Sequence, residues 1–153
     1  MIKNLKYVLL TVLIFSFYGS AFSQLTLKET IKFDTAFSKS KLFDKSEEWI
    51  ALKFVSANDV IQLKNKDNGK IIIKGNLGDS YITQFTLMLS CKDSSVSYLL
   101  TGITSSQYGY LWDSDSNCYT KQCRTNYLNW KSATEITINN LILNYKDYLL
   151  TDL

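Results

Sequence analysis

The chain has 153 residues, of which 46 % are hydrophobic and 20 % charged, and its formal net charge is +3. It contains no histidine, which excludes Ser-His-Asp and Cys-His nucleophiles and most zinc sites. Without Lys3 and Lys6, the 17 basic residues become 15 against 14 acidic ones. We therefore expect no nucleic-acid partner, because such binding needs clustered positive charge.

Residues 1–23 have the layout of a secretory signal peptide. Two lysines precede an apolar run at residues 7–18, and the small residues Ala21 and Ser23 follow it. The run is too short to cross a bilayer, which needs about 20 apolar residues. We expect cleavage before Gln24, no transmembrane span in the mature chain, and a location in the periplasm or outside the cell.

The remaining residues, 24–153, are enough for one domain with a hydrophobic core. Alternating apolar residues predict a strand over 24–33. A helix follows, with Ser38 or Ser40 as its N-cap. Its predicted buried stripe consists of Leu42, Phe43, Trp49, Ile50 and Phe54. Its predicted solvent face consists of Lys41, Asp44, Lys45, Glu47 and Glu48.

The segment "DVIQLKNKDNGKIIIKG", residues 59–75, predicts two short strands joined by a tight turn. Its Gly-Lys pair is also the end of a phosphate-binding loop motif. That motif requires a glycine five residues before Gly69 and a Ser or Thr after Lys70, but Lys64 and Ile71 occupy those positions. We interpret the pair as a hairpin turn.

Two further strands are predicted over 81–91 and 95–104, and residues 107–112 favour an extension of the sheet. In the first strand, Tyr81, Phe85, Leu87, Leu89 and Cys91 share one face. Residues 113–131 are predicted to be a long polar loop. A last helix is predicted to begin at a capping box, Ser132 to Glu135. Its apolar stripe is Ile138, Leu141, Ile142, Tyr145 and Leu149.

This order of strand, helix, strands, helix predicts an α+β domain: an antiparallel sheet of about five strands with two helices packed on one face. Residues 42–54, "LFDKSEEWIALKF", together with "DVIQ" and "NKDNGKIIIKG", resemble a family of secreted Bacteroidetes proteins of unknown function. The resemblance implies a curved, TATA-binding-protein-like (TBP-like) fold and export, and it implies no known activity. A TBP-like fold does not imply DNA binding, because function must be argued from a site.

The three cysteines are expected to differ in state. Cys118 and Cys123 are close in sequence within the predicted loop, so we predict a disulfide between them in an oxidising compartment. Cys91 ends an apolar strand face and is expected to stay reduced in the core.

The carboxylates offer no catalytic or metal-binding constellation. Glu47 and Glu48 are adjacent on a helix and cannot both face one site. Asp113 and Asp115 begin a stretch similar to a calcium loop, but Cys118 replaces its glycine and Arg124 its bidentate glutamate. We expect no enzyme activity, no metal and no cofactor.

A cluster of aromatic side chains is the candidate ligand-binding site. Rings among amides and carboxylates suit stacking on a sugar or gripping a peptide. The alternative is that the same rings pack the loop onto the sheet. The candidates are Tyr108, Tyr110, Trp112, Tyr119, Tyr127 and Trp130.

These observations predict an exported, non-catalytic binding or adaptor domain of the bacterial cell envelope, whose partner is a cell-envelope protein or glycan. The alternative hypothesis is a carrier that holds a lipid or small apolar ligand between the curved sheet and its helices.

Overall fold

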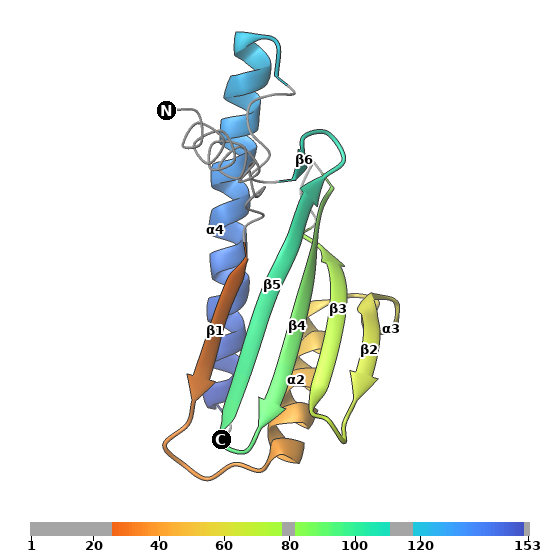
Figure 1. Cartoon of the computed structure of the whole chain (residues 1–153), viewed down its shortest axis with the longest axis vertical. Coiled ribbons are helices and arrows are strands. Elements are labelled where there is room, and N and C mark those ends of the chain that lie inside the picture. The colour runs from red at the N-terminus through yellow and green to blue at the C-terminus, as the bar shows by residue number, and fades with distance from the viewer. Residues whose placement is uncertain (1–25, 78–81, 111–117, 152–153) are drawn as a thin grey trace, which may run out of the picture.

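Two long helices cover one face of an open antiparallel sheet, and no helix of the described residues covers the opposite face, which we call the helix-free face (Figure 1). The computed structural model describes residues 26–77, 82–110 and 118–151, so the predicted signal peptide lies outside the described residues. The strand order is β1-β5-β4-β3-β2, with β6 paired to β5. The strands are β1 (Leu27–Lys32), β2 (Ile61–Asn65), β3 (Lys70–Asn76), β4 (Thr83–Lys92), β5 (Ser95–Ser105) and β6 (Gly109–Tyr110).

Helix α2 (Lys39–Lys53) is the predicted first helix. Ser38 is its N-cap, and its hydroxyl accepts a hydrogen bond from the Lys41 amide at 3.2 Å. The predicted buried stripe is confirmed at four positions, and Phe54, at the C-cap, is half-buried. The buried four are Leu42, Phe43, Trp49 and Ile50.

Lys45 corrects the predicted solvent face of α2, because it is buried. Its ammonium lies 5.4 Å from the centre of the Tyr148 ring, a cation–π distance. The aliphatic stem of a lysine packs well on an apolar surface while the charged end finds a separate partner. Lys45 therefore belongs to the contact between α2 and the last helix.

The hairpin between β2 and β3 confirms the turn interpretation of the Gly-Lys pair. Gly69 has φ of +63°, and a Cβ at this position would lie 2.2 Å from the Cys91 carbonyl oxygen. The chain continues from the turn into strand β3 rather than into a helix. The prediction misses one detail, since Asp59 and Val60 lie in the one-turn helix α3 (Ala57–Val60) and not in β2.

Helix α4 (Lys121–Thr151) corrects the largest error of the sequence analysis. Residues 121–131, predicted as loop, form its first turns, and the Ser132–Glu135 pair lies inside the helix. The hydroxyl of Thr120 accepts the Cys123 amide at 3.1 Å and provides the actual cap. The buried residues continue toward the N-terminus at spacings of three and four. This continued periodicity explains why the helix begins earlier than predicted. Its buried residues are Tyr127, Trp130, Thr134, Ile138, Leu141, Ile142, Tyr145 and Leu149.

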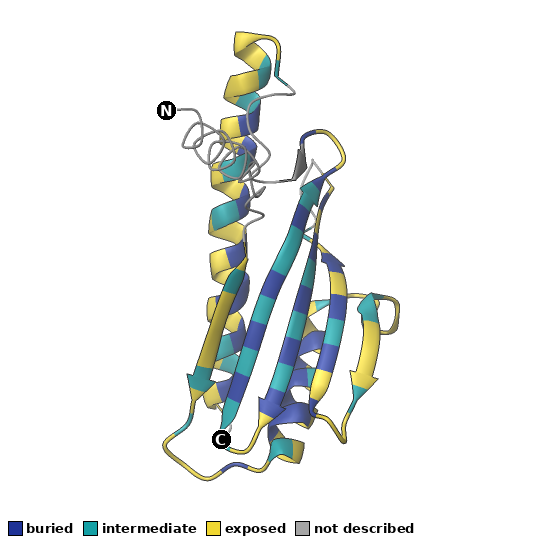
Figure 2. Ribbon diagram, in the orientation of Figure 1, coloured by how far each residue is buried: buried dark blue, intermediate teal, exposed yellow. Residues whose placement is uncertain are grey.

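The core fills the space between the sheet and the two long helices. Strands β3, β4 and β5 alternate between buried residues and residues that are half-buried or exposed, as the colouring along them in Figure 2 shows. Trp49 and Tyr145 join α2 to α4 with ring centres 4.7 Å apart. Tyr145 also donates a hydrogen bond to the Ser46 hydroxyl, which itself donates to the Leu42 carbonyl. The predicted arrangement, an α+β fold with helices on one sheet face, is confirmed.

No helix in the described part of the chain has both the length and the apolar character needed to cross a membrane.

Candidate functional site on the sheet

Three of the six candidate aromatic residues pack against one another inside the protein. The ring centres of Tyr108 and Trp130 are 5.4 Å apart, and those of Tyr127 and Trp130 are 5.8 Å apart. All three side chains are buried, and the Trp130 indole donates a hydrogen bond to the Thr83 hydroxyl at 2.8 Å. This arrangement favours the core-packing alternative for these rings.

Of the other three candidates, the structure describes the side chain of one. Tyr119 is 94 % exposed beside the start of α4. Tyr110 lies in β6, and Trp112 lies outside the described residues. Of the four rings whose side chains the structure describes, three are buried together and Tyr119 is exposed.

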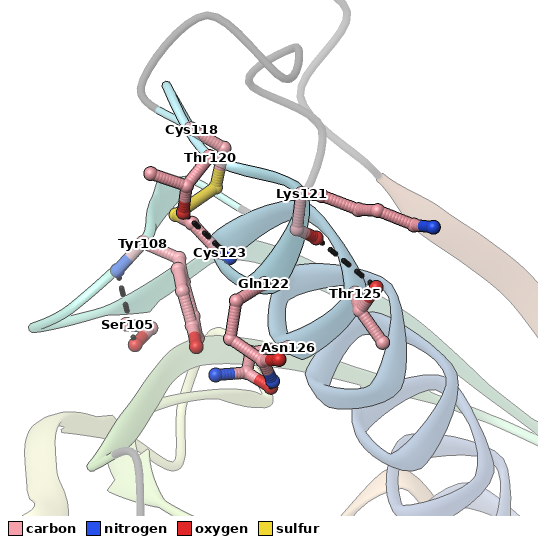
Figure 3. Close-up of a disulfide and its surroundings, with 9 residues drawn as sticks. All are labelled: Ser105, Tyr108, Cys118, Thr120, Lys121, Gln122, Cys123, Thr125 and Asn126. Carbon is pink, nitrogen blue, oxygen red and sulfur yellow. Dashed lines mark hydrogen bonds between the residues drawn. A yellow bond between two sulfur atoms is a disulfide. The ribbon is translucent and has the colours of Figure 1, made fainter.

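The Cys118–Cys123 disulfide links the segment just before α4 to the first turn of that helix (Figure 3). The two Cα atoms are 5.2 Å apart, and Thr120 caps the helix between the two cysteines. Cys91 is a free, buried thiol, and burial raises its pKa. Its sulfur lies 3.7 Å from the Ser46 hydroxyl, inside the core and remote from solvent.

Replacing Cys118 and Cys123 together with serine should lower the free energy of unfolding by about 2 kcal/mol, because the bridge restricts the unfolded chain. Denaturant titration of the oxidised protein and of the double variant measures this difference. Alkylation of the oxidised, denatured protein should label one thiol, at Cys91, and reduction should raise the number to three. Labelling of all three thiols without reductant would show that the bridge does not form.

A polar triad ties the first strand to the last helix. The Tyr98 hydroxyl donates a hydrogen bond to the Glu29 carboxylate at 2.6 Å, and the Lys146 ammonium donates to the same oxygen at 2.8 Å. The hydrogen bond from Lys146 is the main reason that the pKa of Glu29 lies below its usual range. A carboxylate that two hydrogen-bond donors keep ionised joins the elements that it contacts, and it is poorly suited to give up a proton as a general acid.

On the helix-free face of the sheet, side chains of the same kind line up across neighbouring strands. Cross-strand pairing places Lys28 beside Leu99, Leu99 beside Met88, and Met88 beside Ile72. Ile72 in turn pairs with Leu63 on β2. Directly paired residues point to the same side of a sheet. Four aliphatic side chains, from Leu99 to Leu63, thus form a row across the strands, which we call the apolar row.

Hydroxyl groups lie on both sides of the apolar row. On one side, Ser97 and Ser90 are paired neighbours, and the Ser97 hydroxyl lies 2.8 Å from that of Thr30. On the other side, Thr101 pairs with Thr86. A depression of about 230 Å³ covers the centre of the face, where Ile72, Met88 and Leu99 are flanked by Ser90, Ser97, Lys28 and Lys70.

On this face, the charged side chains of the described strands all have the same sign. By the same pairing, five lysines point away from the helices, and they are Lys28, Lys32, Lys70, Lys74 and Lys92. Among the described strands, the one carboxylate is Glu29, which points to the helix side and contacts Lys146 of α4. The ion pairs recorded for the described residues include none of these five lysines.

The sequence contains a signal for this face, although none of the residues named above on it is a predicted site residue. In "KIIIKGN", Lys70, Ile72 and Lys74 alternate with the buried Ile71 and Ile73. Alternation shows that a strand has a second, less apolar face. It does not show which residues of other strands complete that face, since the strand pairing supplies this.

Comparisons with protein families and solved structures agree on the fold. The family model described as "Domain of unknown function (DUF4468) with TBP-like fold" matches residues 28–106, just over half of the chain. A crystal structure of a TBP-like protein from Parabacteroides distasonis has a TM-score of 0.63 at 15 % identity, over 84 % of this chain and 94 % of that one. A crystal structure of a DUF4468 family protein from Bacteroides ovatus has a TM-score of 0.60 at 12 % identity, over 84 % and 87 % of the two chains. Comparison with curated proteins gives no match.

Proposed function

The chain belongs to the family of domains of unknown function (DUF4468) with a TBP-like fold, and on that premise we propose that it is an exported, non-catalytic binding or adaptor domain of the bacterial cell envelope. Its binding surface is the helix-free face of the sheet, and its partner is an anionic component of the envelope. Family and fold leave the activity open, so the proposal rests on the chemistry of this face.

The proposal rests mainly on the five lysines of this face, whose positive charge no carboxylate of the described strands balances there. A face with one sign of charge attracts a partner of the opposite sign and repels another copy of itself. Two of these lysines, Lys28 and Lys70, border the apolar depression, and a surface that combines an apolar centre with a charged rim is typical of recognition sites. Three acids of α2, by contrast, lie on the helix side, and they are Asp44, Glu47 and Glu48.

Two further observations support export and a non-catalytic role. The first 23 residues have the order of a signal peptide, with basic residues, an apolar run and then small residues. The chain lacks histidine, and the described residues contain no group of three or more Cys, Asp or Glu side chains placed to hold a metal ion. Among the described carboxylates, Glu29 has a clearly shifted pKa, and this pKa is lowered, the opposite of what an acid catalyst needs.

Charge reversal on the helix-free face should weaken envelope binding. The test variant is Lys70→Glu with Lys74→Glu, two exposed lysines that flank Ile72. The control is Lys53→Glu with Lys121→Glu, which makes the same charge change on α2 and α4. Purified mature protein is co-sedimented with isolated envelope fractions at increasing salt.

The wild type should bind at low salt and release as salt shortens the Debye length from about 10 Å at 0.1 M to about 3 Å at 1 M. The test variant should bind at least about tenfold more weakly, which corresponds to about 1.4 kcal/mol. The control should bind as the wild type does. Equal binding by the test and control variants would refute the proposed surface.

A further inference from the structure

We propose that the apolar row holds the hydrocarbon chain of a monomeric anionic amphiphile, such as a medium-chain carboxylate, with its headgroup at Lys28 beside the β1 end of the row. This inference rests on the proposed function and names the chemical class of its anionic partner. The alternative hypothesis placed an apolar ligand between the sheet and the helices, but that space is filled by buried side chains such as Phe43, Leu87 and Tyr145. The present inference places the ligand on the helix-free face instead.

The dimensions of the row suit a single extended chain. Leu99, Met88, Ile72 and Leu63 lie on four neighbouring strands, so the row spans three strand spacings, or about 14 Å. Three of its four side chains, Leu99, Met88 and Ile72, are half-buried, and the depression above them is open to solvent rather than enclosed. Such a floor covers one side of a hydrocarbon chain and leaves the other side in contact with water.

The charge beside one end of the row suits an anionic headgroup. Lys28 on β1 is the paired neighbour of Leu99, at that end, whereas Lys70 borders the depression on β3, three strands away. Lysine is a flexible point charge that reaches toward an anion without requiring a fixed geometry. The Ser90 and Ser97 hydroxyls lie on the same side of the row as Lys70 and offer hydrogen-bond donors to a carboxylate.

Other occupants fit these observations less well. A second copy of the face would bring five lysines against five lysines. A glycan favours aromatic rings and amides, and the floor here is aliphatic. A bilayer favours protruding apolar groups, yet the apolar row lies in a depression, and Leu63, its one exposed member at 43 %, is at the sheet edge.

The first test is a chain-length series. Sodium carboxylates from butyrate to tetradecanoate are titrated into the mature protein by calorimetry, each below its micelle concentration. Because the floor covers about half of the chain, each added pair of methylenes should tighten Kd about fourfold until the chain exceeds the row. Dodecanol, which has the same length of chain without the charge, should bind at least about tenfold more weakly than dodecanoate.

The second test locates the site. Met88→Gln keeps a similar volume at the centre of the row and should weaken dodecanoate binding at least about tenfold. Lys28→Gln should weaken it about threefold or more and reduce the preference for dodecanoate over dodecanol. Leu52→Gln, at a side chain that is 71 % exposed on α2, is the matched control and should bind as the wild type does. Thermal melts verify that each variant is folded.

The outcomes separate this inference from the proposed function. A Kd that does not depend on chain length, or that Met88→Gln leaves unchanged, overturns the amphiphile inference. So does binding to anionic vesicles without binding of monomeric carboxylates. If envelope binding still requires Lys70 and Lys74 in those cases, the proposed function stands without it. If neither carboxylates nor envelope fractions bind, both proposals fall.

Discussion

Trp49→Ala should lower the free energy of unfolding by about 3–5 kcal/mol, the cost typical of truncating a large buried aromatic side chain. The Trp49 side chain is only 2 % exposed and packs on Tyr145 and Phe54, with ring centres 4.7 and 6.0 Å away. Its indole also donates a hydrogen bond to the Asn144 side chain at 2.9 Å. The substitution therefore opens a cavity and removes the principal contact between α2 and α4.

Urea titration of Trp49→Ala and of Leu52→Ala measures the effect. Leu52 is on the same helix, and its 71 % exposure predicts a loss of less than about 0.5 kcal/mol. Similar losses for the two variants would mean that α2 does not bury the face that carries Trp49.

Trp130→Ala should cost a similar amount, about 3–5 kcal/mol, and it decides between the two interpretations of the aromatic cluster. Trp130 is 1 % exposed, contacts the rings of Tyr108 and Tyr127, and donates a hydrogen bond to Thr83 of β4. If the cluster is core, the melting temperature falls by several degrees or more. Trp130→Phe, which retains a ring but lacks the hydrogen bond, should lose less.

Leu128→Ala is the matched control, since Leu128 is two residues away on α4 and is 51 % exposed. It should leave the melting temperature nearly unchanged. A Trp130→Ala variant that melts like the wild type but loses binding to an envelope partner would instead make the cluster a binding surface.

Where local signals and the core agreed, the sequence was sufficient to predict the fold. In α2, the Ser38 cap and the spacing of Leu42, Trp49 and Ile50 indicate the same helix, and the structure has it. To predict the hairpin at Gly69, the turn residues and the failed match to a phosphate-binding loop were sufficient. These features depend on residues close together in the chain, so a sequence contains most of their information.

The start of α4 was predicted wrongly because a misleading local signal outweighed a longer periodicity. Ser132 and Glu135 have the spacing of a capping box, but they lie in the helix interior. Tyr127, Trp130 and Thr134 already continue the buried stripe, and the Cys123 amide is capped by Thr120. Counting the apolar period through the aromatic residues would have placed the start correctly.

The candidate site could not be predicted, because it depends on register between strands. Leu63 is at one end of the apolar row and Lys28 lies just beyond the other end, and only the order β1-β5-β4-β3-β2 brings their strands into one face. A shift of one residue in any strand would send its lysines to the other side of the sheet. Propensity and spacing within one strand do not determine that register.

The position of β1 in the sheet has a consequence for the order of folding. Strands β2 to β5 follow one another as neighbours, so each can pair with a strand that the ribosome has just produced or is about to produce. Strand β1 is made first but pairs with β5, and Glu29 and Tyr98 are 69 positions apart. Contacts over such separations carry a large loop-closure entropy and form late. We expect the meander of β2 to β5 to collapse first and the N-terminal strand to dock last, so that the segment behind the predicted signal peptide stays extended while the rest of the chain is still being made.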